Sequence, residues 1–287
     1  MYRLFILILM TGLFGCNNIN KEPGKPVIGL SILPQKYLVA SIADTLADIV
    51  VMVPPGASPA TWEATPAQMK SLGDALIYFR IGHIGFEKAW MTKAAEINPE
   101  MKITDLSENL TLRGMSYDHG DHSHSGIDPH VWMSPGNMEI MAEKVFDELL
   151  KLFPQHKEFL ERNYSALLVE IEETGQFASD QLSAYKGETF LIFHPSLGYF
   201  ADDYGLLQAA IENEGKEPSS AHMIKIIDMA RSKGIKVIFV QQEFDRRNAE
   251  IIANEIEGQV IEFDPLSESW PDEIKNLSLS LKNSFQK

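Results

Sequence analysis

The chain has 287 residues, of which 45% are hydrophobic, so it is long enough and apolar enough to build two lobes with buried cores. Its formal net charge is −15, from 40 acidic and 25 basic residues. A surface this acidic repels phosphate backbones and attracts cations, which argues against nucleic acid as a partner. Because there is only one cysteine, no disulfide forms within the chain.

The first residues have the pattern of an export signal. Arg3 is followed by an apolar run from Leu4 to Phe14, which is too short to span a bilayer but suits the core of a signal peptide. Cys16 follows directly and resembles the lipobox cysteine of bacterial lipoproteins, although Phe14 is bulkier than the usual residue there. We therefore expect a lipoprotein signal peptide over 1–15, lipidation at Cys16 and a polar tether over 16–25. The alternative is a plain secretory signal with a cysteine present by chance.

Short apolar runs alternate with amphipathic ones from Pro26 onward. Strands are predicted at 27–33, 48–53 and 75–82, and helical spacing at 38–47 and 66–75, with Thr65 as the N-cap before Pro66. This order predicts an α/β lobe over 26–153 whose strands are parallel and joined by crossover helices.

A stretch without any strand signal follows, over 154–186. Its apolar residues recur at helical intervals and only Gly175 interrupts them, so one helix of roughly 45 Å is predicted. Two shorter helices that meet near Gly175 are the alternative.

The remaining residues, 187–287, repeat the α/β style of the first half. Strands are predicted at 189–194, 235–241 and 259–265, with a helix over 220–233 that ends at Gly234 in a C-cap position. The fold class is therefore α/β, with two lobes that each contain a parallel-type sheet flanked by helices.

Three potential metal ligands stand at strand ends or at the start of a loop. His194 and Asp264 follow predicted strands, where ligands of parallel sheets bind, and His130 closes a run in which four of the eight histidines fall within twelve positions. Taken singly, each is also typical of a hydrogen-bonded core histidine or a turn-forming aspartate. Together they indicate a transition-metal site.

Five separated motifs make the chain resemble the zinc- and manganese-binding substrate-binding lipoproteins of bacterial ABC importers. They are VPPGASPATWEATPAQM, DPHVWMSP, GYFADDYGL, EGKEPSSAHM and FDPLSESW, and the resemblance extends from Pro26 to the C-terminus. It implies two α/β lobes joined by one long rigid helix, with the metal in the cleft between them. The segment at 154–186 suits the role of that helix.

The resemblance places metal ligands on His130, His194 and Asp264, and it departs from the family at a fourth. Ala60 occupies the position of the family's first histidine ligand, and alanine cannot bind a metal. His83 is the first candidate to replace it, with Glu63, Glu87 and Glu243 as weaker ones. The alternative is a site with three protein ligands that a water completes.

The other histidines of the run, His119, His122 and His124, lie in a loop over 117–127. This loop resembles a shortened form of the mobile His- and Asp-rich loop of the zinc-specific members. Imidazole with carboxylate favours Zn²⁺ over Mn²⁺, so the loop is predicted to hold a second, weaker zinc ion or to concentrate zinc near the cleft. A loop that binds nothing is the alternative. Because histidine ligands must be neutral, zinc binding should weaken as the pH falls through about 6.5.

The resemblance implies a receptor that captures Zn²⁺ outside the cytoplasmic membrane and delivers it to an ABC permease and its ATPase. We expect a monomer that is held to the membrane by its lipid anchor, and no enzymatic activity. One alternative is a surface lipoprotein for adhesion or zinc storage. The other is a zinc hydrolase that uses the position opened by Ala60; against it, the chain has no H-E-x-x-H helix, no G-x-S-x-G elbow and no cysteine ligand pattern.

Overall fold

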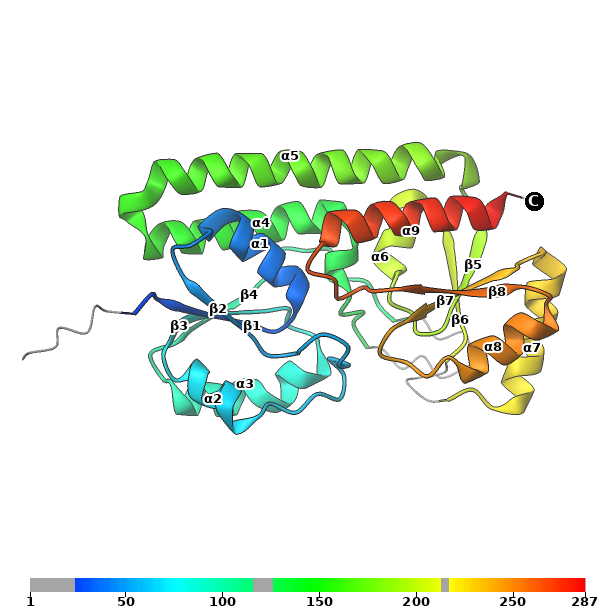
Figure 1. Cartoon of the computed structure of the whole chain (residues 1–287), viewed down its shortest axis with the longest axis horizontal. Coiled ribbons are helices and arrows are strands. Elements are labelled where there is room, and N and C mark those ends of the chain that lie inside the picture. The colour runs from blue at the N-terminus through cyan, green and yellow to red at the C-terminus, as the bar shows by residue number, and fades with distance from the viewer. Residues whose placement is uncertain (1–23, 116–125, 213–216, 287) are drawn as a thin grey trace, which may run out of the picture.

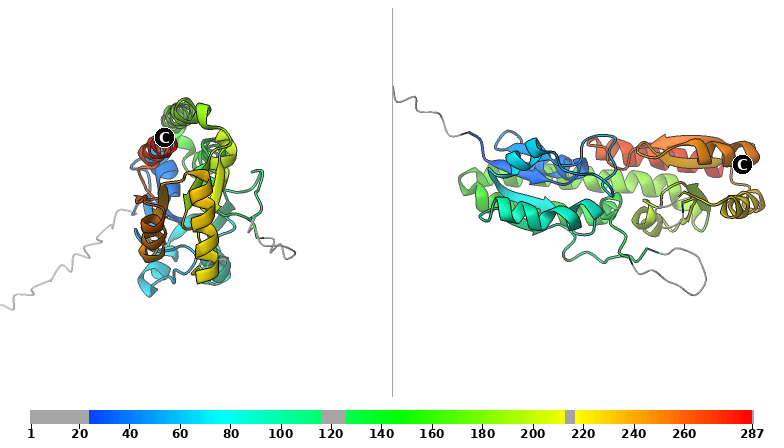
Figure 2. Two further views of the ribbon diagram at one scale, coloured as in Figure 1. Left: turned by 90° about the vertical axis from the view of Figure 1, so that its right-hand side faces the viewer. Right: turned by 90° about the horizontal axis from the view of Figure 1, so that it is seen from below.

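Two four-stranded parallel sheets lie side by side along the long axis of the molecule (Figures 1 and 2). The structure is a computed structural model that describes residues 24–115, 126–212 and 217–286. The strand orders are β2-β1-β3-β4 in the N-terminal lobe and β6-β5-β7-β8 in the C-terminal lobe. The strands are β1 (Val27–Leu30), β2 (Asp48–Val51), β3 (Ala75–Arg80), β4 (Lys102–Asp105), β5 (Thr189–Ile192), β6 (Leu207–Ala210), β7 (Val237–Gln241) and β8 (Gln259–Phe263).

Helices cover both faces of each sheet (Figure 1). α1 and α4 lie between the N-terminal sheet and α5, while α2 and α3 cover the opposite face; in the C-terminal lobe α9 lies toward α5, and α7 and α8 lie on the other side. The helices are α1 (Leu33–Ala43), α2 (Pro66–Leu72), α3 (Gly85–Ile97), α4 (Pro135–Leu152), α5 (Lys157–Leu182), α6 (Gly198–Tyr204), α7 (Ser220–Lys233), α8 (Arg247–Glu255) and α9 (Trp270–Phe285), with short 3-10 turns at Val131–Met133, Pro154–His156 and Ser183–Tyr185.

α5 runs along both lobes as one uninterrupted helix (Figure 1). Gly175 lies inside it without ending it, so the alternative of two helices is wrong. A Cβ at Gly175 would lie 3.1 Å from Pro135 Cβ, at the start of α4. Glycine at this position therefore lets α4 and α5 approach closely. The two parallel sheets and the single long helix confirm the fold class predicted from the sequence.

The local signals at two helix ends act as predicted. Thr65 accepts the N–H of Gln68 and caps α2, and Gly234 ends α7 in the left-handed conformation at φ +68°. β4 and β6, in contrast, were missed. Each is a four-residue strand beside stronger ones; β4 (KITD) has two β-branched residues between two charged ones, and β6 (LQAA) has none.

The positions of the two hydrophobic cores explain why the strand sequences are continuous apolar runs. In β7, Val237 and Phe239 pack in the core that both lobes share with α5, whereas Ile238 and Val240 pack in a second core under α7 and α8. Strands buried on both faces need apolar residues at every position.

The predicted signal peptide, Cys16 and most of the histidine-rich loop lie outside the described residues. Within 24–115, 126–212 and 217–286, no helix combines the length and the apolar character that crossing a bilayer requires.

Candidate metal centre

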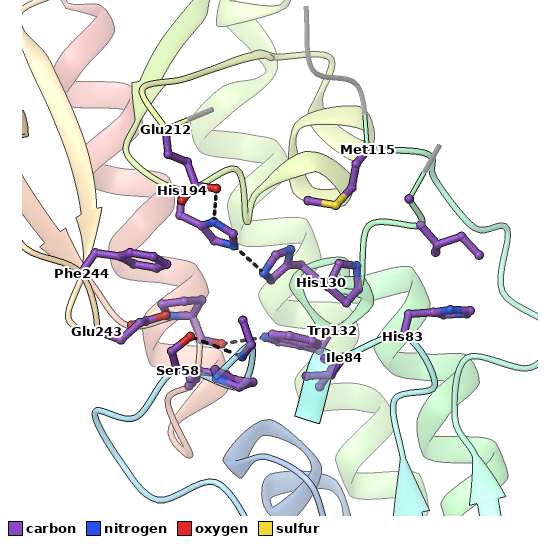
Figure 3. Close-up of a pocket in the computed structure, with 18 of the residues that line it drawn as sticks. Ser58, His83, Ile84, Met115, His130, Trp132, His194, Glu212, Glu243 and Phe244 are labelled. Atoms are coloured by element: carbon purple, nitrogen blue, oxygen red, sulfur yellow. Dashed lines mark hydrogen bonds and ion pairs between the residues drawn. The ribbon is translucent and has the colours of Figure 1, made fainter. Parts of the chain in front are cut away.

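A cavity of about 310 Å³ opens between the two lobes (Figure 3). Its walls come from the loops that follow β2, β3, β5, β6, β7 and β8, together with the segment that precedes α4. Because all strands in each sheet are parallel, their carboxyl ends meet at one edge, and the two edges face each other across the cavity.

His130 and His194 face each other in this cavity, one from each lobe (Figure 3). Their Nε2 atoms are 3.4 Å apart, and the side chains are only 11% and 19% exposed. The ring of Phe244 stacks on His194 at 4.9 Å, and Trp132 meets the ring of His130 edge-on at 5.3 Å. Packing therefore holds both imidazoles in place.

A buried carboxylate orients each imidazole from behind. His130 Nδ1 lies 2.7 Å from Asp128 Oδ1, and His194 Nδ1 lies 2.7 Å from Glu212 Oε1. When each Nδ1–H donates to its carboxylate, both Nε2 atoms carry lone pairs that point toward each other. The two Nε2 atoms lie within hydrogen-bonding distance of each other, and a metal ion between them would accept both lone pairs.

The distance between these nitrogens fits zinc. Two nitrogen ligands at about 2.05 Å from a tetrahedral Zn²⁺ lie about 3.3 Å apart, close to the separation in the structure. Nitrogen donors backed by hydrogen-bonded carboxylates are also the ligand set in which zinc is commonly found.

Asp128 is tied into the junction between the lobes. Burial acts to raise its pKa, but the hydrogen bonds from His130 and the charge of Arg113 outweigh burial and lower it. Arg113 Nε also pairs with Asp202 on α6 at 2.9 Å, and the Tyr199 hydroxyl donates to the carbonyl of Asp128. The residue that orients His130 is therefore itself held by the C-terminal lobe.

Asp264, the third predicted ligand, does not line this cavity. Its Oδ1 accepts the N–H of Leu266 at 2.9 Å in a tight turn, and its side chain lines a neighbouring cavity with Glu273. Among the described residues, no three side chains of His, Cys, Asp or Glu lie close enough together to hold a metal ion. The structure thus brings together two of the three predicted ligands.

The predicted substitutes for the first histidine fall in different places. His83 and Glu243 line the cavity, as Ala60 does. Glu63 is exposed and does not belong to the described residues that line the cavity. Burial lowers the pKa of His83, which favours the neutral imidazole that binds metals. Burial raises the pKa of Glu243; the charge of Asp264 raises it further, and His194 opposes that rise.

Glu87 lies under the cavity wall and serves the loop that carries His83. Its carboxylate accepts the N–H groups of Ile81 and Gly82, both at 2.6 Å, and the Ser31 hydroxyl. It is 1% exposed and its oxygens are used by these donors, so its role is to shape the loop.

His119, His122 and His124 lie outside the described residues. The neighbouring described residues, Met115 and Gly126, line the cavity, so the loop begins and ends at its wall.

Sequence analysis missed the two carboxylates behind the histidines. Asp128 stands two positions before His130, a spacing that allows its side chain to reach the imidazole, and this signal was available. Glu212 follows β6, and since that strand was not recognised, nothing placed Glu212 near His194.

A family model and a solved structure match nearly the whole chain. The family model described as "ZnuA: Zinc-uptake complex component A periplasmic" matches residues 28–283. A crystal structure of ZnuA superposes with a TM-score of 0.85 at 33% identity, and the match covers 91% of this chain and 99% of that one.

Two curated relatives are more distant in sequence. The zinc-binding lipoprotein AdcA of Streptococcus pneumoniae strain R6 is 24% identical over 274 residues, covering 92% of this chain but 54% of AdcA. This chain thus spans about half the length of AdcA. The high-affinity zinc uptake system protein ZnuA of Bacillus subtilis strain 168 is 26% identical over 235 residues, covering 78% of this chain and 73% of that protein. With a family model that matches from residue 28 to residue 283, the chain belongs to the ZnuA family.

Proposed function

We propose that this chain is an extracytoplasmic receptor that captures Zn²⁺ and delivers it to an ABC permease and its ATPase for zinc uptake. The family is described as a periplasmic component of zinc-uptake complexes, and the names of the matched relatives refer to zinc binding or zinc uptake. The cleft between two rigid lobes suits capture and release of a small cargo.

One observation carries the choice of cargo. His130 and His194 turn their Nε2 atoms toward each other from opposite lobes, at a separation that matches two ligands of one zinc ion. Buried carboxylates at both Nδ1 atoms hold this arrangement in place. Imidazole donors favour zinc over manganese.

We further propose that the receptor acts as a monomer anchored through a lipid on Cys16, and that it catalyses no reaction. The apolar run before Cys16 and the lipoprotein among its relatives support the anchor. The members of the ZnuA family are substrate-binding receptors. This membership favours neither the adhesion alternative nor the hydrolase alternative.

A calorimetric titration tests this proposal. The metal-stripped chain, residues 26–287, is titrated with Zn²⁺ and with Mn²⁺, and a variant that lacks residues 118–125 is titrated in the same way. We expect one tight zinc event that survives the deletion, a weaker zinc event that the deletion removes, and weaker binding of Mn²⁺. Zinc binding no tighter than that of Mn²⁺ would contradict the proposed cargo.

The carboxylate that joins the two histidines has two candidates. Asp264 is the ligand implied by the sequence resemblance, and Glu243 is the one on the cavity wall. They follow adjacent strands, and the charge of Asp264 raises the pKa of Glu243. We propose Asp264 as the ligand, reached when its carboxylate leaves the Leu266 N–H for the metal. Asp264→Asn should then weaken zinc binding at least tenfold more than Glu243→Gln does, and the reverse order would assign the role to Glu243.

A further inference from the structure

The cavity is much larger than the proposed cargo. A zinc ion held by two histidines and completed by two waters adds about 60 Å³ of water, at about 30 Å³ each. The cavity measures about 310 Å³, which is in the range of sites that hold small organic molecules.

The described residues also supply too few donors. Two Nε2 atoms converge, and no cluster of three metal-binding side chains exists within 24–115, 126–212 and 217–286. Where the resemblance expects a further histidine, the wall is formed by Ala60 and by the Gly85 backbone against which it packs, and neither has a side-chain donor. Even when Asp264 turns to the metal, a four-coordinate zinc ion here still lacks one donor.

Part of the remaining wall, beside His83 and Glu243, suits an organic molecule with a negative end. Ile84, Ile127, Phe244 and Leu266 present apolar surface, which a hydrated ion does not use. Lys88, an exposed residue in the first turn of α3, lines the same cavity, and its ammonium has no carboxylate partner among the described residues.

We propose that the cavity binds zinc together with a small amino acid chelator of the histidine type, which donates amine and imidazole nitrogens to the metal and its carboxylate to Lys88. With His130, His194 and Asp264, the metal is then five-coordinate. This inference rests on the proposed zinc function and specifies the form in which zinc enters. A chelator with one negative charge lowers the charge of the cargo from +2 to +1, which reduces the cost of placing it against apolar walls. Its carbon atoms fill the space beside Ile84 and Phe244.

Equilibrium dialysis with labelled L-histidine tests the proposal directly. The metal-stripped full chain is dialysed against L-histidine with and without one equivalent of Zn²⁺, and both protein-bound label and protein-bound zinc are measured. We expect about one histidine per chain with zinc and at least tenfold less without it. Labelled histamine, which has the same two nitrogens but no carboxylate, should be retained at least tenfold more weakly.

Two variants locate the chelator. Lys88→Gln should reduce the retention of L-histidine to that of histamine, whereas Lys93→Gln, at a second exposed lysine of α3 that does not line the cavity, should leave it unchanged. Ala60→His, which adds an imidazole to the wall, should abolish histidine retention and bind zinc alone more tightly. Retention that is equal for histidine and histamine, or unaffected by Lys88→Gln, would overturn the role of Lys88.

Other outcomes separate this inference from the proposed function. If zinc binds the chain and L-histidine is not retained, or only removes zinc, the chelator is wrong and the zinc receptor stands. If histidine is retained only by the variant without residues 118–125, that loop fills the cavity in the full chain, and the chelator is again wrong. If zinc binds neither alone nor with histidine, the proposed function itself fails.

Discussion

At the scale of single residues, zinc affinity should depend on the carboxylates behind the histidines as well as on the histidines. Glu212 is buried, and its Oε1 holds His194 Nδ1 at 2.7 Å. Glu212→Gln keeps the shape of the side chain and removes its charge, so the imidazole becomes less basic and less firmly oriented. We expect zinc affinity to fall about 10- to 100-fold, as measured by calorimetry. Glu188→Gln, an exposed carboxylate of the same lobe, serves as the control, and equal affinities for the two variants would contradict the role of Glu212.

The residues of the site differ in how far the sequence could predict them. His194 was predicted because it follows a strand of a parallel sheet, and His130 because it closes a histidine-rich run and lies in a family motif. Asp264 was found by motif, but the structure shows its carboxylate bonded to the Leu266 N–H, a local turn contact that competes with the cavity. Such a competition between two nearby partners depends on side-chain rotation, which sequence patterns do not contain.

At the scale of elements, the loop between β3 and α3 depends on a buried carboxylate. Burial raises the pKa of Glu87, so its protonated form is favoured in the folded state. The contribution of Glu87 to stability should therefore be greatest at low pH and should be lost as the pH rises from about 4.3, the ordinary value for Glu, through its raised pKa. In Glu87→Gln this side chain cannot ionise. The free energy of unfolding of the variant minus that of the wild type should therefore increase from pH 5 to pH 8. Urea unfolding at both pH values measures this, and a difference that does not change with pH would refute it.

The linking helix α5 is held by an apolar face. Ile171 is fully buried on it, whereas Val169, two residues away, is 53% exposed. Ile171→Ala leaves a cavity and should lower the free energy of unfolding by about 2–5 kcal/mol. Val169→Ala should change it by less than about 0.5 kcal/mol. Chemical denaturation of both variants compares them, and equal effects would show that α5 is not held by this face.

At the scale of the whole molecule, two tryptophans join the lobes next to the site. Trp132 Nε1 donates to the Pro265 carbonyl at 2.7 Å, and Trp270 Nε1 donates to the Trp132 carbonyl at 2.8 Å. Trp132→Phe leaves a buried carbonyl without its donor and should cost about 1–3 kcal/mol of stability. It should also weaken zinc binding, because His130 lies two residues away. Trp90→Phe is the matched control, and an unchanged zinc affinity in Trp132→Phe would show that the site does not need this contact.

The architecture was more predictable than the junction between its lobes. Apolar runs, capping residues and glycine positions indicated two parallel sheets and a long helix, since these signals are local. The contacts of Trp132 with Pro265 and of Arg113 with Asp202 join residues more than eighty positions apart, and no local pattern relates them. The short strands β4 and β6 were missed for a related reason, because their pairing with stronger neighbours stabilises them more than their own composition does.

The most direct test of the central claim is zinc titration of His130→Ala and His194→Ala beside the wild type, with His156→Ala, an exposed histidine before α5, as the control. If the two facing imidazoles hold zinc, the wild type and His156→Ala should bind one tight zinc ion per chain. Each of the other two variants should bind that ion at least a hundredfold more weakly. Tight binding that persists in both His130→Ala and His194→Ala would show that zinc is held elsewhere and would contradict the account.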